Sequence, residues 1–521
     1  MQSRETLLGV LEQAVRAVRG YREPTALDPS AELTELGLGS LQAMELLVII
    51  EQQSGVQLPD TILHQVRTVG DLLDAMALTP EHAAQNGPVG RGEPERPALP
   101  EQSGGAAHAR PSRPGLQAIV DLVDRAEVPS PYFAVHEGVP DATTVVNGAR
   151  MAAFSASDYL GLAGDPYVLH AAKQAIDRYG TSVAASRAVS GERVIHRELE
   201  NDLADFLGAQ ASLAFVSGHG TNVSVLSHLA GPGDLIVRDA LAHNSLVQGS
   251  ELSGARCRVF PHNDVAFLSR LLTAERGRYR RVVVVAEGVY SMDGDLADLP
   301  GLVELRERYD VLLYLDEAHS IGVLGASGAG AAEHFGVPST DIDVRMGTFS
   351  KSLASCGGFV AGSAGLIGLV KQTAPGFIYS TGLAPSAAAA ARAALRQLRE
   401  RPQLAAVARG QAALFRHLAH RAGLDTGRSS DGSCVVPVVV RDAETALRLA
   451  ALLADRGISV CPFVPPAVEA DQSRLRFFVT ARHTDAHITA AVSATAQSLD
   501  DLARGGMHTT SAALAQNPPG D

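Results

Sequence analysis

The amino-acid sequence predicts an α/β protein whose central sheet is mostly parallel and covered by helices on both faces, preceded by a small all-α domain. From about residue 115 to 505, apolar strand-like runs such as 281–286 and 311–315 alternate with helical stretches, which is typical of a buried parallel sheet. Residues 1–82 instead show apolar residues at helical spacing. A length of 521 residues is enough for more than one domain.

The first predicted domain, residues 1–82, is acidic and helical. Asp and Glu outnumber Lys and Arg in it by twelve to five. The apolar residues of its first helix form one stripe: Leu7, Leu8, Leu11, Val15 and Val18. Residues 83–114 are rich in Ala, Gly and Pro and predict a flexible linker, while residues 506–521 predict a disordered tail.

The composition excludes several classes of partner and site. A net charge of −13 and a pI near 5.7 argue against binding to nucleic acid or to anionic membrane surfaces. The N-terminus has no apolar signal core and no segment approaches the length of a membrane span, so we expect a cytoplasmic protein without membrane contact. The four cysteines are scattered without a CxxC pair, so we expect neither disulfides nor a metal site.

Lys351 lies among small and hydroxylated residues just after the strand-like stretch 343–345. An amine in this position can form a Schiff base with pyridoxal 5'-phosphate (PLP), while nearby hydroxyls and backbone N–H groups hold the phosphate. Taken alone, Lys351 is better explained as an exposed loop lysine. The cofactor interpretation therefore depends on other residues of the large domain.

Asp316 supplies the first support, because it follows the buried run 311–315, and α/β sheets bind ligands at the carboxyl ends of their strands. A carboxylate there can keep a pyridine nitrogen protonated, although an isolated strand-end Asp is most often a turn or helix cap. His319 follows closely and could reach the phenolic oxygen of the same ring. Gly218 and His219 lie in a glycine-containing turn that opens a helix, where N–H groups could cradle a phosphate.

Many short segments in a fixed order identify the large domain by resemblance. They are 154–162, Ser190-Gly191, His196, 241–245, 287–295, 316–319, 322–325, 348–351, 379–381 and 474–477. Together they resemble the α-oxoamine synthases, fold-type I PLP enzymes that include 8-amino-7-oxononanoate synthase and serine palmitoyltransferase. The resemblance implies a fold-type I transferase over residues 115–505, with a mostly parallel sheet and a smaller C-terminal α+β subdomain. It also implies a homodimer.

The resemblance assigns roles to individual positions. Lys351 would form the Schiff base and move protons at the substrate Cα, Asp316 would pair with the pyridine nitrogen, and His243 would stack on the ring and help position the acyl substrate. The other implied cofactor contacts are Ser291 and His319 near O3', Glu287 as support, Thr348 with the backbone of Gly218 and His219 at the phosphate, and Ser380 and Thr381 at the neighbouring subunit's cofactor. Near the amino acid substrate the resemblance implies Arg476 at the α-carboxylate, Ser157 in place of the family's usual Asn, and Ser186 in the small-residue loop.

Residues 35–46 resemble acyl carrier proteins, in which the serine that opens the second helix carries 4'-phosphopantetheine. Ser40 occupies that position, although a serine there is also a natural helix N-cap. Carrier domains usually have Asp before this serine, and this chain has Gly39. The expected partners are therefore a phosphopantetheinyl transferase and a carrier-loading enzyme, and the alternative is an unmodified interaction module.

The two resemblances together imply an activity. The expected reaction is a decarboxylative condensation of a small amino acid with an acyl thioester carried on Ser40, which gives an α-aminoketone in specialised metabolism. Glycine, alanine and serine all remain open, with a lean toward alanine or serine, because Ser157 and the segment 465–468 depart from the family pattern. The alternatives are a carrier-linked PLP aminotransferase and a non-catalytic docking scaffold.

Overall fold

The computed structural model describes residues 4–19, 27–29, 46, 49–50, 54, 68–77 and 114–505. Two compact units divide the chain, residues 1–112 with 257–261 and residues 113–256 with 262–521. Ser40, Gly39, almost all of the linker predicted at 83–114 and the tail predicted at 506–521 lie outside the described residues, so the structure does not bear on those predictions.

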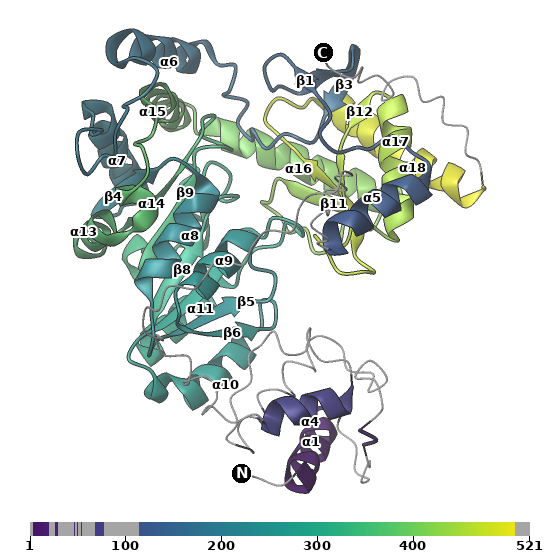
Figure 1. The fold of residues 1–521 in the computed structure, drawn as a ribbon. Coiled ribbons are helices and arrows are strands. Elements are labelled where there is room, and N and C mark those ends of the chain that lie inside the picture. The colour runs from purple at the N-terminus through teal and green to yellow at the C-terminus, as the bar shows by residue number, and fades with distance from the viewer. Residues whose placement is uncertain are drawn as a thin grey trace, which may run out of the picture. The chain divides into compact units, whose positions relative to one another are not determined.

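The N-terminal unit is described through helices α1 (Arg4–Arg19) and α4 (Val69–Ala77), labelled in Figure 1. Thr68 begins α4 with a reciprocal cap, in which Asp71 N–H donates to Thr68 Oγ1 at 3.1 Å and Thr68 N–H donates to Asp71 Oδ2 at 2.9 Å. The apolar core of this unit contains Leu7, Leu11, Ala14, Val15, Leu27, Leu46, Ile50, Val69, Leu72, Leu73 and Met76. The predicted stripe of the first helix is confirmed for its buried members.

The large unit is built on a seven-stranded sheet, whose last strand, β6 (Arg256–Phe260), contains residues that the division into compact units assigns to the other unit. Its strands are β4 (Ala211–Phe215), β5 (Leu235–Asp239), β6 (Arg256–Phe260), β7 (Val282–Glu287), β8 (Leu312–Asp316), β9 (Val344–Thr348) and β10 (Gly358–Gly362), in the order β4-β10-β9-β8-β7-β5-β6. Strands β5, β7, β8 and β9 are parallel, whereas β10 runs antiparallel to both β4 and β9. All six residues of β7 are buried. Because successive side chains point to opposite faces, both faces of the sheet are covered, as predicted.

Helices surround this sheet, as Figure 1 shows. They are α6 (Pro166–Tyr179), α7 (Val194–Leu207), α8 (Gly218–Leu229), α9 (Asn244–Leu252), α10 (Val265–Glu275), η3 (Arg276–Arg278), α11 (Leu299–Tyr309), α12 (Ala331–Phe335), η4 (Ser339–Asp341), α13 (Ala364–Thr373), α14 (Pro375–Ile378) and α15 (Pro385–Glu400). Helices α6, α7 and α15 pack together over a shared core.

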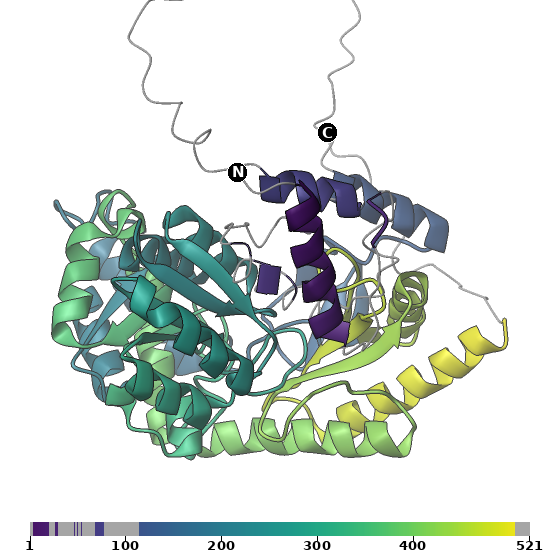
Figure 2. The same cartoon turned by 90° about the horizontal axis from the view of Figure 1, so that it is seen from below.

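A smaller subdomain combines both ends of the large unit. Antiparallel strands β11 (Val435–Arg441), β14 (Ser473–Phe478) and β13 (Cys461–Phe463) form one sheet, and β1 (His136–Glu137), β2 (Thr143–Val146), β3 (Ala149–Ala153) and β12 (Ile458–Ser459) form another. Its helices are α5 (Pro114–Ala126), α16 (Gln403–Arg421), α17 (Ala443–Asp455) and α18 (Asp485–Ala503), seen from a second direction in Figure 2. Since β3 pairs with β12 and α5 packs on α17, the predicted C-terminal subdomain also includes the segment that precedes the large sheet.

Two further findings concern the described part of the chain. It contains no helix that is both long and apolar enough to cross a membrane. It also contains no group of His, Cys, Asp and Glu side chains arranged to hold a metal ion.

Candidate active site

Two carboxyl groups meet at the carboxyl edge of the large sheet. Glu287 ends β7 and Asp316 ends β8, and the two residues are direct partners in the parallel register. Asp316 is only 5% exposed, and it accepts hydrogen bonds from Ala318 N–H at 2.9 Å and from Asn222 Nδ2 at 2.7 Å. Burial is the main cause that raises the pKa of Glu287 well above its ordinary value, and the nearby Asp316 raises it further. The edge therefore combines a hydrogen-bonded aspartate with a glutamic acid that favours its neutral form.

Lys351 lies in the loop that follows β9, whose end is adjacent to β8 in the sheet. Burial lowers the pKa of its amine, Arg476 lowers it further, and Asp316 and Glu287 oppose this shift. A lowered pKa increases the fraction of free amine at neutral pH, and the free amine is the form that attacks a carbonyl. The structure thus brings Lys351 within electrostatic reach of Asp316, Glu287 and Arg476.

The N-terminus of α8 lies against the ends of β9 and β10. Ser217 caps this helix by accepting from Gly220 N–H at 3.2 Å. A Cβ on Gly218 would lie 2.8 Å from Thr348 Oγ1, and a Cβ on Gly358 would lie 2.7 Å from Gly218 Cα, so both positions need glycine. This close approach leaves the first N–H groups of a 12-residue helix beside the Thr348 hydroxyl. Helix N-termini of this kind bind phosphate groups.

His243 lies at the N-cap of α9, where its backbone N–H donates to Glu287 Oε1 at 2.6 Å. Its imidazole crosses the ring of His219 with centroids 6.3 Å apart at 78°. The ring is thereby available to stack on a planar ligand at the edge of the sheet.

His319 lies deeper in the site than His243. Its Nδ1 lies 2.7 Å from the hydroxyl of Tyr159, and its ring stacks on Phe478 with centroids 6.1 Å apart. Burial is the main cause that lowers the pKa of His319 well below its ordinary value, and the charge of Lys351 adds to this. Ser291 is also buried and lies close to Arg476, whose Nη1 donates to its backbone oxygen at 2.9 Å.

Arg476 projects from β14 as a cation held between two aromatic rings. Its guanidinium carbon lies 4.1 Å from the ring centroid of Phe463 and 4.4 Å from that of Phe478. Burial lowers its pKa to about 10, so it remains charged at neutral pH. Among the described residues no carboxylate pairs with Arg476, and its buried Nε has no hydrogen-bond partner. Such a guanidinium fits the carboxylate of a ligand.

Ser186 and Thr381 lie in two loops that are joined to each other. The two residues form an antiparallel bridge, and the Ser186 hydroxyl donates to the backbone oxygen of Ile378. Ser380 is half-buried and Thr381 is exposed. Ser157 is half-buried, and its backbone oxygen accepts from Tyr159 N–H at 2.9 Å.

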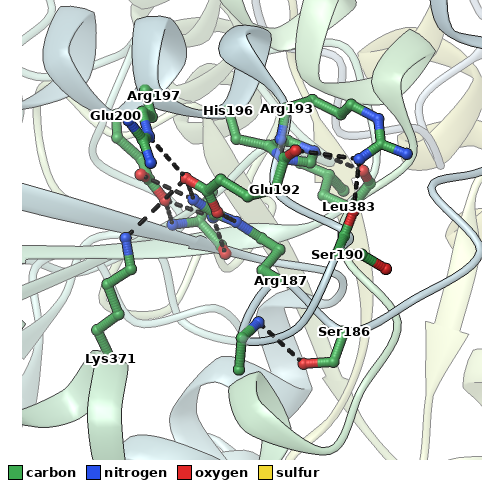
Figure 3. A network of polar contacts seen from close by, with 12 residues as sticks. Ser186, Arg187, Ser190, Glu192, Arg193, His196, Arg197, Glu200, Lys371 and Leu383 are labelled. Atoms are coloured by element: carbon green, nitrogen blue, oxygen red, sulfur yellow. Dashed lines mark hydrogen bonds and ion pairs between the residues drawn. The ribbon is translucent and has the colours of Figure 1, made fainter.

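Figure 3 shows the buried polar network beneath these loops. Arg187 donates to Glu200 at 2.5 and 3.0 Å and to Glu192 at 2.7 and 3.0 Å. His196 lies 2.8 Å from the backbone oxygen of Leu383 through its Nε2. The network therefore fixes the positions of both loops.

Sequence reasoning did not identify the residues that hold the site together. Asn222, Ser245 and Tyr314 connect Asp316 to His243, Tyr159 holds His319, and Arg187 anchors the loop of Ser186. In the sequence these residues look like ordinary core and helix residues. Asn222 and Asp316, for example, are 94 positions apart, so a single sequence gives no sign of their contact.

The residues present fit PLP at three points. Lys351 provides a buried amine, Asp316 a buried carboxylate at the adjacent strand end, and the Gly218–Thr348 cradle a space that a Cβ would fill. The unpaired Arg476 adds a position for a substrate carboxylate.

Comparison with known proteins gives two family matches. Residues 149–494 match the family "Aminotransferase class I and II", and residues 10–76 match "Phosphopantetheine attachment site". An 8-amino-7-oxononanoate synthase from Geobacter sulfurreducens is 43% identical over 363 residues, which cover 69% of this chain and 92% of that protein. A second, from Treponema denticola, is 39% identical and covers 68% of this chain and 89% of that protein.

Solved structures give a consistent result. A serine palmitoyltransferase variant from S. paucimobilis with a bound PLP–myriocin aldimine is 30% identical, with a TM-score of 0.71 over 75% of this chain and 97% of that chain. An 8-amino-7-oxononanoate synthase from Francisella tularensis is 26% identical, with a TM-score of 0.59 over 68% of this chain and 99% of that chain. The predicted fold class is confirmed by these similarities.

Proposed function

Because the chain belongs to the α-oxoamine synthases, PLP-dependent C-acyltransferases with the fold of class I and II aminotransferases, and carries an N-terminal phosphopantetheine attachment domain, we propose that it condenses a small amino acid with an acyl thioester held on Ser40. The carboxylate of the amino acid leaves as CO2, and the product is an α-aminoketone. The observation that supports this most strongly is that Lys351 lies within electrostatic reach of Asp316, at the end of β8, and of Arg476, which comes from β14 and has no carboxylate partner among the described residues.

PLP, when bound, supplies a carbonyl that forms a Schiff base with an amine and a ring that accepts the electron pair released at Cα. Asp316 would pair with the ring nitrogen, and Asn222 donates a hydrogen bond to that carboxylate at 2.7 Å. The N-terminus of α8 and the Thr348 hydroxyl would hold the phosphate. Ser291 and His319 would lie near the phenolic oxygen, and Glu287 accepts a hydrogen bond from the backbone N–H of His243.

Lys351 moves the protons of the reaction. Its lowered pKa leaves a free amine after the substrate has displaced it, and this amine takes the proton from Cα. After carbon–carbon bond formation and loss of CO2, the same group returns a proton to carbon. Arg476 holds the α-carboxylate by charge-assisted hydrogen bonds and so sets the orientation of Cα toward Lys351. Ser157 and Ser186 lie on the amino acid side of the site.

The acyl donor arrives on the chain's own arm. A linker over residues 83–114 between a carrier domain (residues 1–82) and the synthase domain (residues 115–505) gives a tethered thioester a high effective concentration at Lys351. In a homodimer, the half-buried Ser380 and the exposed Thr381 would reach the cofactor of a second subunit. A separate enzyme loads the carrier, and the α-aminoketone serves specialised metabolism.

Intact-protein mass spectrometry tests the proposal directly. The full chain is modified with phosphopantetheine, loaded with an acyl group and supplied with glycine, alanine or serine, while CO2 is measured. We expect loss of the acyl mass together with one equivalent of CO2 for one amino acid. Transfer of an amino group without CO2 would instead identify an aminotransferase.

Two variants separate the roles of tether and site. Ser40→Ala should abolish turnover of the tethered substrate while the absorbance of bound PLP stays unchanged, because Ser40 belongs to a separate domain. Lys351→Ala should remove both turnover and the Schiff-base absorbance. If Ser40→Ala works at full rate from the natural acyl donor, tethering is wrong although the synthase activity stands.

A further inference from the structure

Asn222 contacts two parts of the site at once. This residue of α8 is 2% exposed, and its Nδ2 donates to Asp316 Oδ2 at 2.7 Å and to Ser245 Oγ at 2.9 Å. Its Oδ1 accepts from the hydroxyl of Tyr314 at 2.8 Å, and burial keeps that hydroxyl protonated by raising its pKa well above the ordinary value. Because an ionised carboxylate can only accept, the amide nitrogen must face Asp316. The orientation of the amide is therefore fixed, and both of its hydrogens are used.

The hydrogen bonds at His243 fix the other end of this chain of contacts. The backbone N–H of Ser245 donates to His243 Nδ1 at 3.2 Å, and Ser245 Oγ lies 2.7 Å from the same nitrogen. A backbone N–H cannot accept, so Nδ1 must carry a lone pair. Ser245 Oγ already accepts from Asn222, and its own hydrogen is free to point at Nδ1. The donors thus run in one direction, from Asn222 through Ser245 to His243.

We propose that Asn222 and Ser245 are positioning residues that hold His243 as the neutral ring with its proton on Nε2, so that His243 meets its ligand as a hydrogen-bond donor and not as a base. A proton on Nδ1 would be directed against the Ser245 N–H, which has no other orientation available. Asn222 also binds Asp316, the residue proposed to pair with the pyridine nitrogen of PLP. One side chain therefore orients both Asp316 and His243. The assignment of the ring form rests on hydrogen-bond geometry, whereas its use in acyl transfer rests on the proposed function.

The electrostatic surroundings of the His243 ring, like its hydrogen bonds, mainly favour the neutral form. Burial is the largest influence that lowers the pKa of His243, and the positive charge of nearby side chains lowers it further, whereas Asp316 raises it. The charged and titratable groups that act on the ring are Asp316, Lys351, His219 and Arg476. Glu287 accepts from the backbone N–H of His243, and burial raises the pKa of that acid. The neutral ring is therefore favoured by its environment as well as by its hydrogen bonds.

A fixed Nε2–H donor has a direct use in acyl transfer. It can donate to a thioester carbonyl oxygen as negative charge develops there, without a change in its own protonation. A histidine that could act as a base would instead compete with Lys351 for the proton on Cα. In this arrangement Lys351 moves protons and His243 donates a hydrogen bond.

Three variants of the full-length holoenzyme test this assignment. Ser245→Ala removes the hydroxyl donor, Asn222→Ala removes the residue that orients it, and Ser245→Thr is the matched control that keeps a hydroxyl. Hydrogen exchange at the imidazole C2 position, followed by mass spectrometry, gives the pKa of His243 itself in each protein. We expect a pKa below the ordinary histidine value in the wild type and in Ser245→Thr, and a higher one in both alanine variants.

The kinetics should change in parallel. The acidic limb of the pH profile of kcat/KM should move to higher pH in Ser245→Ala, and kcat at neutral pH should fall about tenfold with a smaller change in the KM for the amino acid. The absorbance of bound PLP confirms that each variant is folded, and if Asn222→Ala does not fold, the two Ser245 variants decide. A wild-type His243 that titrates at or above the ordinary value, or a Ser245→Ala protein with unchanged His243 pKa and pH profile, would overturn the proposal.

Discussion

Replacement of Arg187 by methionine should destabilise the synthase unit strongly, because it leaves a buried carboxylate without its cation. The guanidinium donates twice to Glu200, whose side chain is 9% exposed, and twice to Glu192, whose side chain is 20% exposed. It also lies over the ring of Phe377 at 5.0 Å. Arg187 therefore binds one nearly buried carboxylate and one partly exposed carboxylate. The two contribute differently to the loss of stability in Arg187→Met.

The magnitude follows from the burial of each partner. Breaking a buried ion pair from one side costs about 3–5 kcal/mol, which applies to Glu200. Glu192 faces solvent in part and also receives Arg197, so its share is at most about 1 kcal/mol. We therefore expect Arg187→Met to lower the free energy of unfolding by about 3–5 kcal/mol. The loop of Ser186 should lose its anchor at the same time.

Urea unfolding followed by far-UV circular dichroism measures this loss, since the chain has no tryptophan for fluorescence. Arg197→Met is the matched control, because this arginine binds the same Glu192 but its side chain is 71% exposed, and it should cost less than about 0.5 kcal/mol. The double variant Arg187→Met/Glu200→Gln should recover part of the loss by removing the unpaired charge. An Arg187→Met protein that unfolds at the wild-type urea concentration would refute the reasoning.

Three further outcomes follow from the site and its surroundings. Gly218→Ala should weaken PLP binding about tenfold, because the new Cβ would lie 2.8 Å from Thr348 Oγ1, whereas Gly220→Ala, with 3.4 Å of clearance to its nearest neighbour, should bind PLP normally in an absorbance titration. Arg476→Lys should raise the KM for the amino acid by about tenfold or more with a smaller change in kcat, since an ammonium cannot form the bidentate contact; equal KM values would contradict this. His262, whose two ring nitrogens bind Asp239 and Asp295, has its pKa raised to about 9 by hydrogen bonds to these carboxylates, against the cost of burial. Its stabilising effect is thus complete below the ordinary histidine pKa and is lost as pH rises through about 9, so urea midpoints should fall over that window and His262→Gln should flatten the fall.

The sequence predicted those parts of the site that depend on strand ends and local spacing. Asp316 follows an apolar run, so its place at the carboxyl edge of the sheet could be deduced from periodicity alone. Lys351 was ambiguous by itself, and it became identifiable through its order relative to Asp316 and the other family segments. The resemblance to α-oxoamine synthases is confirmed by the comparisons, whereas the roles of single residues stay predictions.

The remainder depends on contacts between residues far apart in the chain. Asn222 is an ordinary helix residue until the fold places it against Asp316, and Tyr314 faces it from inside a buried strand. In the same way, β3 pairs with β12 although some three hundred residues separate Ala152 from Ile458. Such contacts arise from tertiary packing, for which propensity and periodicity carry no information.

The charges of the site also bear on how the product leaves. Burial lowers the pKa values of Lys351 and Arg476, of which Arg476 remains a cation at neutral pH, and burial raises the pKa of Glu287. Among the described residues Arg476 has no carboxylate of its own, so a substrate carboxylate completes its hydrogen bonds. In the proposed reaction that carboxylate departs as CO2. The α-aminoketone then lacks the group that Arg476 binds, so the chemistry that forms the product also removes its strongest contact with the site and favours its release.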